Sequence, residues 1–245
     1  MYIKKNFFML FFTFFVSITC FAQDFDSFEN EFNAKQKDVY DPLEGYNRVM
    51  TDFNDFVYMN VLEPTARGYA NVVPETARTG LSNFFYNLGF PIRFVNNILQ
   101  FKFGRACEEL GRFTINSTFG LLGFLDPATR NLNMDSYKED FGQTLGFYGV
   151  GEGIPIVLPF LGPSNIRDIL GTTADGYVSP LTDTSALNYK IPNNAAETLG
   201  IRIVHVVNET SLNLGVYENL KKDAIDLYPF LRDTYSQKRE KEIRE

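Results

Sequence analysis

Apolar residues recur every three or four positions along most of the chain, which is the pattern of helices that bury one face. The first such stretch starts at Asp41, which can cap a helix, and continues with Pro42 and Glu44, which both suit a first helical turn. Apolar positions then recur as far as Val57. Because proline interrupts a helix, we expect this one to end at Pro64.

Further helices are expected along the rest of the chain. One begins after Pro74, one at Pro91 and one near Arg105, each with its own apolar stripe. Residues 199–214 also keep a helical period, and although their segment IRIVHVV could be read as a strand, we favour helix. Pro229 opens a last helix that gives way to a solvated, charged end. These patterns predict a mainly α, single-domain fold.

A segment rich in glycine and proline, residues 142–168, is the largest irregular part of the chain. Pro155, Pro159 and Pro163 interrupt its apolar run, and each lacks an N–H donor. Residues 154–163 therefore suit neither a regular helix nor a central strand. Their apolar side chains need protein or lipid around them, so we consider both a buried loop and a wedge at a membrane interface. The candidate membrane-contact residues are Ile154, Ile156, Val157, Leu158, Phe160 and Leu161.

The glycines of this segment leave a stretch of backbone without side chains. Such backbone bends sharply or lets another surface approach closely, so it suits a turn-rich loop, a hinge or the lining of a passage. A phosphate-binding loop is disfavoured, because Pro155 interrupts the helix that would have to follow the glycines. The glycines concerned are Gly142, Gly146, Gly149, Gly151 and Gly153.

Residues 1–22 are typical of a secretory signal peptide. Two lysines near the start precede an apolar run from Phe7 to Ile18, which is too short for a comfortable membrane span. Cleavage after Ala22 is one outcome and lipid attachment to Cys20 is the other, although the residues before Cys20 match the lipid-attachment pattern imperfectly. The segments expected after the signal peptide are an acidic tether at 23–39, a helical domain at 40–240 and a charged tail at 241–245.

Charge and the scarcity of reactive side chains exclude several functions. With 23 Lys and Arg against 30 Asp and Glu, the net charge is −7, which disfavours nucleic acid as a partner. Cys107 is the single cysteine after the signal peptide, and His205 is the single histidine, so a familiar zinc site is not expected. Adjacent acids at 108–109 and 139–140 indicate solvated charge. No Gly-x-Ser-x-Gly elbow occurs, and we expect neither catalysis nor a cofactor or metal.

Several longer motifs occur in a characteristic order. DPLEGYNRVM begins at Asp41, RTGLSNFFYNL at Arg78, GRFTINSTFGLLGFLDPA at Gly111 and EDFGQTLGFYGVGEGIPIVLPFLGPSNIRD at Glu139. In order and spacing these stretches resemble the MlaA (VacJ) family, outer-membrane lipoproteins of Gram-negative bacteria that take part in phospholipid trafficking. The resemblance covers residues 40–240, more weakly toward the C-terminus.

The resemblance implies a ring of helices that lies in the inner leaflet of the outer membrane around an amphipathic passage for phospholipid. Members of the family remove phospholipid misplaced in the outer leaflet and pass it to a periplasmic carrier protein, often while bound to trimeric porins. The glycines would shape this passage, and the residues expected to line or brace it are Asn47, Arg48, Arg112, Asn116, Gln143 and Arg167. A purely structural hydrogen bond is the alternative for each. The alternative for the whole protein is a porin-associated structural protein without a lipid passage.

Overall fold

The computed structural model describes residues 39–186, 188 and 190–245. The expected signal peptide, the candidate lipidation residue Cys20 and all of the expected tether except Val39 lie outside the described residues. The chain divides into two compact units, Met1–Tyr40 and Asp41–Glu245. The architecture described below is that of the second unit.

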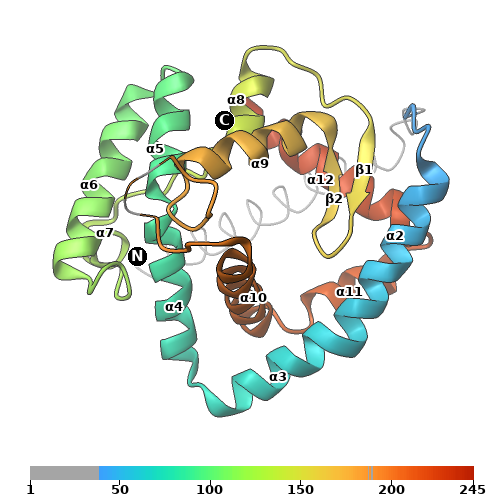
Figure 1. Cartoon of the computed structure of the whole chain (residues 1–245), viewed down its shortest axis with the longest axis horizontal. Coiled ribbons are helices and arrows are strands. Elements are labelled where there is room, and N and C mark those ends of the chain that lie inside the picture. The colour runs from blue at the N-terminus through green and yellow to red at the C-terminus, as the bar shows by residue number, and fades with distance from the viewer. Residues whose placement is uncertain (1–38, 187, 189) are drawn as a thin grey trace, which may run out of the picture. The chain divides into compact units, whose positions relative to one another are not determined.

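The unit Asp41–Glu245 is mainly helical, as the periodicity predicts. In chain order its elements are α2 (Glu44–Val57), η1 (Tyr58–Leu62), α3 (Glu63–Val72), α4 (Glu75–Leu88), α5 (Phe90–Leu99), α6 (Phe103–Phe119), α7 (Pro127–Leu132), α8 (Phe141–Phe147), β1 (Pro155–Leu158), β2 (Gly162–Asn165), α9 (Ile166–Val178), α10 (Ala195–Leu212), α11 (Val216–Asp223) and α12 (Leu227–Arg244). Within the unit these elements follow one another around a ring (Figure 1). α2 and α3 form one side, α5 and α6 the opposite side, and α8, α9 and α12 a third.

The helical path that begins at α2 does not end at Pro64, so this sequence expectation was wrong. It continues through the π-helical turn η1 into α3, in which Pro64 occupies the first turn. A proline in the first turn of a helical segment removes only an N–H donor that would have no partner there. The π turn breaks the regular α-helical hydrogen-bonding register just before Pro64, so α3 can begin as a new segment. The first helix also starts later than expected, because α2 begins at Glu44 rather than at Pro42. Asp41 Oδ1 still accepts a hydrogen bond from the Leu43 N–H.

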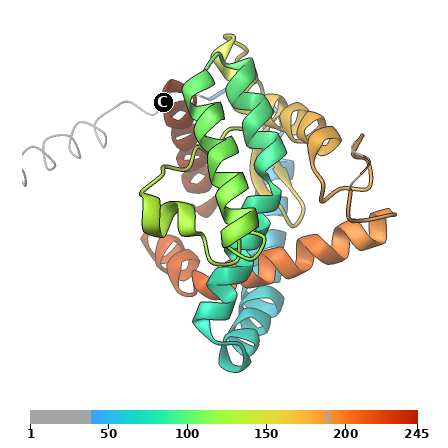
Figure 2. The same cartoon turned by 90° about the vertical axis from the view of Figure 1, so that its left-hand side faces the viewer.

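The C-terminal half confirms one expectation and corrects another. IRIVHVV lies inside α10, so the helical interpretation is confirmed. The last helix, however, does not give way to a solvated end: α12 continues to Arg244, and Arg239 within it is buried. α10 leaves the ring, because Figure 1 shows it nearly end-on and Figure 2 shows it projecting sideways.

The proline-rich run forms an antiparallel hairpin, with Pro155 paired to Asn165 and Leu158 to Gly162. Both strands are edge strands, which tolerate proline, and neither is a central strand, as expected. Of the six candidate membrane-contact residues only Val157 is buried. Phe160 is 72% exposed, with its backbone in the left-handed region at φ 63°. The strands of the hairpin are therefore partly buried, while its tip at 159–161 is exposed.

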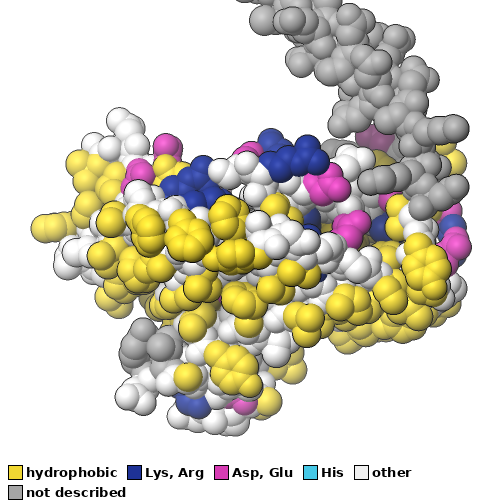
Figure 3. All heavy atoms as spheres, turned by 90° about the horizontal axis from the view of Figure 1, so that it is seen from above, with side chains coloured by type: hydrophobic (Ala, Val, Ile, Leu, Met, Phe, Trp, Pro, Cys, Tyr) yellow, Lys and Arg dark blue, Asp and Glu magenta, His cyan; other side chains and the backbone are white. Residues whose placement is uncertain are grey.

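Polarity is inverted between the inside and the outside of this unit. Among the described residues, eight apolar side chains, including Pro180 and Pro192, and 24 polar or charged side chains are buried. Large apolar side chains instead lie on the surface, where they form a broad band beneath an edge that carries most of the visible charge (Figure 3). The exposed large apolar side chains of the unit include Val49, Phe56, Val61, Phe101, Phe103, Phe119, Leu121, Leu122, Leu170 and Tyr177. None of the described helices is both long and apolar enough to cross a bilayer.

Candidate functional site

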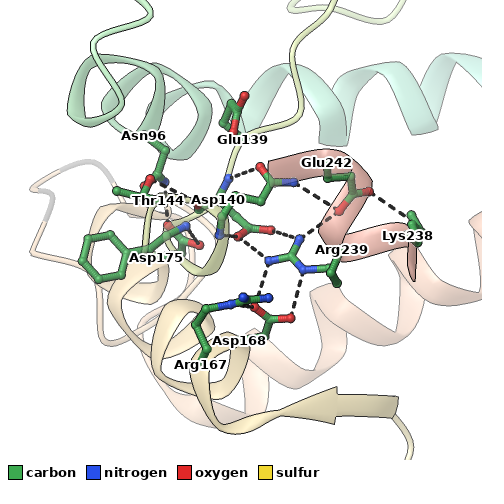
Figure 4. Close-up of polar contacts among 12 residues, drawn as sticks. Asn96, Glu139, Asp140, Thr144, Arg167, Asp168, Asp175, Lys238, Arg239 and Glu242 are labelled. Carbon is green, nitrogen blue, oxygen red and sulfur yellow. Dashed lines mark hydrogen bonds and ion pairs between the residues drawn. The ribbon is translucent and has the colours of Figure 1, made fainter. Parts of the chain in front are cut away.

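A buried polar network joins α8, α9 and α12 (Figure 4). At its centre Arg239 donates from Nε and Nη2 to the two carboxylate oxygens of Asp168, at 2.9 and 3.0 Å. The same guanidinium donates from Nη1 and Nη2 to Asp140, at 2.8 Å each. An uncompensated guanidinium at this depth would cost several kcal/mol, so the two carboxylates are needed to hold it. Arg239 therefore ties the C-terminal helix to the start of α8 and to α9.

The charges within this network affect one another. Burial opposes ionisation of Asp168, but the hydrogen bonds from Arg239 and Tyr235 lower its pKa below the ordinary value. The Tyr235 hydroxyl donates to Asp168 Oδ2 at 2.7 Å. Burial raises the pKa of Tyr235, and its bond to the carboxylate raises it further, so this hydroxyl keeps its proton. The centre of the network thus carries ionised, fully paired groups.

Asp175 extends the network to α5. Its Oδ1 accepts from Asn96 Nδ2 at 2.9 Å and its Oδ2 from the Phe141 N–H at 3.0 Å, so it joins α9 to α5 and to the first turn of α8. Asn96 Oδ1 in turn accepts from Thr144 Oγ1 at 2.8 Å. Burial raises the pKa of Asp175 to about 6, because no cation bonds directly to its carboxylate.

Three predicted passage residues lie in this network as braces. Gln143 forms a capping box with Asp140 at the start of α8. Arg167 donates from Nε to Asp168 Oδ1 at 3.1 Å and from Nη1 to the Val150 carbonyl at 3.4 Å, which connects the network to the glycine loop. Gly142 lies at the crossing of α8 and α9, where a Cβ would meet Asp168 Oδ1 at 2.5 Å.

A second cluster holds the hairpin against α2. Asn47 is fully buried and donates to the Pro155 carbonyl at 3.0 Å, while its Oδ1 accepts from the Val157 N–H at 2.8 Å. Asn54 makes the same pair of bonds with the Leu158 carbonyl and the Phe160 N–H, at 2.9 and 2.7 Å. The next predicted residue along, Arg48, points to the surface instead and pairs with Glu44 and Asp226.

A third cluster lies at the α6–α7 corner. Asn116 donates to Asp126 Oδ1 at 2.7 Å and accepts from the Ala128 N–H at 3.0 Å. Arg112 donates to the Met134 carbonyl at 2.5 Å. Both predicted residues are buried, and they hold the short helix α7 onto α6.

The remaining glycines occupy different environments. Gly146 packs against Ile243 of α12, where a Cβ would overlap the isoleucine side chain. Gly149 has φ +85° and Gly153 has φ +73°, a conformation that favours glycine. The space beside Gly149 and Gly151 is open, and the loop 148–153 that carries them is largely exposed. This loop and the exposed hairpin tip at Phe160 are the parts of the segment that another molecule could approach.

A model of the MlaA lipoprotein family matches residues 39–242. The chain belongs to the MlaA lipoprotein family. It is 35% identical over 201 residues to the intermembrane phospholipid transport system lipoprotein MlaA of Escherichia coli, covering 81% of this chain and 76% of that protein. With the Haemophilus influenzae protein of the same name it shares 39% identity over 144 residues, 57% of each chain.

A solved structure shares the fold of this chain. This MlaA family member superimposes with a TM-score of 0.70 and 31% identity on a chain described in connection with the structural basis for maintenance of bacterial outer membrane lipid asymmetry. The match covers 83% of this chain and 98% of that chain. The ring-like helical fold is therefore shared.

In this MlaA family member the acidic pairs are not simply solvated, so that expectation was wrong. Glu109 is fully buried and accepts from Arg93 Nε at 2.8 Å. Glu139 is also buried and pairs with Lys102 Nζ at 2.7 Å, while Asp140 binds Arg239. Neighbours in sequence point to different partners, and each partner comes from a part of the chain that the local sequence does not identify.

The main residue of the buried network that sequence reasoning missed in this MlaA family member is Arg239. It lies in a run of alternating charges, and its burial depends on α8 and α9. One signal was available: Tyr228, Tyr235, Arg239 and Glu242 keep a helical period into that run, which marks one packed face. Asn54 was missed as well. Within the described residues no group of three or more His, Cys, Asp and Glu side chains could hold a metal ion.

Proposed function

We propose that this protein is the outer-membrane component of a phospholipid transport system. In this role it removes phospholipid that has strayed into the outer leaflet and passes it to a periplasmic carrier protein, which maintains lipid asymmetry. The names of the E. coli and H. influenzae relatives, both intermembrane phospholipid transport system lipoproteins, support the transport part of the proposal.

The observation that carries the proposal is the inverted polarity of the unit Asp41–Glu245. Side chains such as Phe56 and Phe119, 62% and 79% exposed, would each leave apolar surface in water at about 25 cal/mol per Å². A continuous apolar band of this kind indicates an apolar surrounding rather than a solvent-facing surface. A ring of polar interior and apolar circumference suits immersion in a single leaflet, and we assign it to the inner leaflet of the outer membrane.

The physical problem in this transport is a molecule with two apolar chains and a charged head. Exposing the chains to water costs about 0.8 kcal/mol per CH₂ group, which makes a free aqueous path prohibitive. A ring that leaves the chains in the bilayer has only to offer the headgroup a polar route. We assign the lining of that route to the exposed loop 148–153, with Gly149, Gly151 and Gly153. Of the buried residues, Arg167 then braces this loop through the Val150 carbonyl, while Asn47, Arg112, Asn116 and Gln143 brace the surrounding ring.

Export and anchoring complete the proposal. The signal peptide at residues 1–22 would deliver the chain across the inner membrane, and either lipid on Cys20 or the apolar band would keep it at the outer membrane. Trimeric porins are the proposed membrane partner. Intact mass of the mature chain separates the two anchors, since a diacylated Cys20 and an unmodified start at Gln23 differ in mass by several hundred daltons.

The test is the phospholipid content of the outer leaflet in cells that lack this protein. We expect that content to rise and to return to normal when the wild-type gene is restored. An unchanged outer leaflet in the deletion strain would contradict the proposal.

Gly151→Leu separates transport from a purely structural, porin-associated role. The space beside Gly151 is open, so the fold accepts the substitution while the loop becomes bulkier. We expect reduced rescue despite normal insertion into the membrane. Gly104→Leu is the matched control, because Gly104 also has open space beside it but lies on α6. Full rescue by both variants would favour the structural role.

A further inference from the structure

α10 is attached to the ring by only one of its ends. Near its C-terminus the fully buried Asn208 donates to the Arg78 carbonyl of α4 at 2.9 Å and accepts from the Tyr69 hydroxyl of α3 at 3.2 Å. Arg78 in turn donates to the Ser211 carbonyl at 2.5 Å. None of residues 195–206 is buried, but the His205 ring packs on Phe85 of α4 with centroids 4.7 Å apart, so the first ten residues of the helix project from the ring. Figure 2 shows this projection on the side opposite the end of α12.

The loop before α10 packs onto the projecting end of the helix. The Ile191 N–H donates to the Pro180 carbonyl at 2.8 Å, and the Asp183 N–H donates to Thr198 Oγ1 at 3.0 Å. Lys190 Nζ donates to the Asp183 carbonyl at 2.5 Å. Residues 179–186 and 190–206 thus form one structure, here named the finger. These internal bonds satisfy backbone groups that would be costly to leave unpaired in lipid.

The finger has an apolar shaft and a polar tip. Leu199, Ile203 and Val206 share one face of α10 and are 58%, 54% and 37% exposed. The polar residues at the tip are Asp183, Lys190, Asn193, Asn194 and Glu197. In Figure 3 the finger is the projection below the apolar band, on the side away from the charged edge. Arg202 and His205 are the polar residues on the shaft: the long side chain of Arg202 can extend to a polar boundary, and the His205 ring packs on Phe85 of α4.

The length of the shaft matches one leaflet. The ten projecting residues of α-helix rise about 15 Å, and half of a bilayer's hydrocarbon core is also about 15 Å thick. A shaft of this length that starts at the apolar band would bring the polar tip to the far headgroups. In water, exposed leucine, isoleucine and valine side chains would not stabilise the helix. Apolar residues along the shaft with charged residues at the tip therefore suit lipid better than water.

We infer that the finger inserts into the leaflet beyond the ring, with its shaft among acyl chains and its tip at the headgroups of that leaflet. The inference rests on the proposed function, because it takes the ring to lie in one leaflet. It gives the protein a direct contact with lipid of the opposite leaflet, which is the leaflet from which the proposed transport removes phospholipid.

The experiment uses the full mature protein carrying Cys107→Ser, which removes the exposed thiol of α6. A single cysteine replaces Ile203 on the shaft, Phe56 on the band or Lys241 near the charged end, and each is labelled with an environment-sensitive fluorophore. The protein is added from outside to phosphatidylethanolamine–phosphatidylglycerol vesicles that carry a mid-chain quencher lipid in the inner leaflet only. We expect the Ile203 probe to be quenched at least twofold more than the Phe56 probe, and the Lys241 probe to be unaffected.

The outcomes separate the two proposals. With quencher in both leaflets, a quenched Phe56 probe beside an unquenched Ile203 probe overturns the finger insertion but leaves the immersed ring intact. If neither probe is quenched, the immersion of the ring fails and the finger insertion fails with it. The emission of the Ile203 probe could also shift to the blue without being quenched by the lipid. If energy transfer then occurs between probes on two copies of the protein, the shaft contacts protein rather than acyl chains, and the inference is overturned.

Discussion

Asn47 and Asn54 lie on one face of α2 and each clasps the hairpin in the same way, accepting a backbone N–H and donating to a carbonyl two residues earlier. Seven residues of helix rise about 10.5 Å, so Asn47 meets strand β1 while Asn54 meets its end and the turn that follows. Through these bonds a helix serves as the missing neighbour of an edge strand. The two asparagines fix the hairpin beside α2.

Alanine at either asparagine should release part of the hairpin. Asn47→Ala leaves buried backbone groups of Pro155 and Val157 without partners, and we expect a loss of about 1–3 kcal/mol in the free energy of unfolding. Asn54→Ala should cost less, because Asn54 is only partly buried, and should mainly speed hydrogen exchange of the Phe160 amide. Asn60→Ala is the control, since Asn60 bonds only within its own helical path. If hydrogen exchange of the Val157 amide is unchanged in Asn47→Ala, the role of Asn47 in holding the hairpin is contradicted.

Leucine at Arg239 should destabilise the protein strongly. The substitution leaves Asp168 buried without its main partner, and we expect a loss of about 3–5 kcal/mol, measured by chemical unfolding in detergent. Asp168→Asn in the same chain should recover part of the loss, because it removes the uncompensated charge. Arg244→Leu, on a side chain that is 79% exposed, should change stability by less than about 0.5 kcal/mol. Similar losses in Arg239→Leu and Arg244→Leu would refute a buried network.

The crossing of α8 and α9 depends on glycine at Gly171. A Cβ there would overlap the backbone of Gly142, which cannot move like a flexible side chain. We expect Gly171→Ala to cost about 1–3 kcal/mol through overpacking. Gly104→Ala, in open space on α6, should instead stabilise by roughly 0.5–1 kcal/mol through helix propensity. Thermal unfolding of both variants in one detergent checks the prediction, and a stabilised Gly171→Ala would disprove the close crossing.

Asp175 should give the stability a dependence on mildly acidic pH. Burial raises its pKa in the folded protein to about 6, above the value of about 3.9 in an unfolded chain. Between those values the folded protein holds the proton more often than the unfolded chain, so this group lowers stability as pH rises. Relative to Asp175→Asn, the wild type should lose roughly 2 kcal/mol between pH 4 and 6. A stability difference that stays constant across this range would contradict the assignment.

Local pattern predicted the helices well and the breaks between them less well. The starts after Pro74 and near Pro91 and the helical character of α10 follow from periodicity, because a helix must keep its apolar positions on one side whatever it packs against. Pro64 was misjudged, because a π turn can reset the register ahead of a proline and no local rule signals it.

The sequence by itself determined the family, the mainly helical fold and the irregular glycine and proline segment, since these depend on residue order and short-range sterics. Only the tertiary structure decided which polar residues are buried. Asn47, Glu109 and Arg239 are surface-type residues by composition, yet each is buried because its partners arrive from distant parts of the chain. The ionic and hydrogen-bonding partners of a side chain depend on where helices meet in space, and local sequence carries no direct record of that.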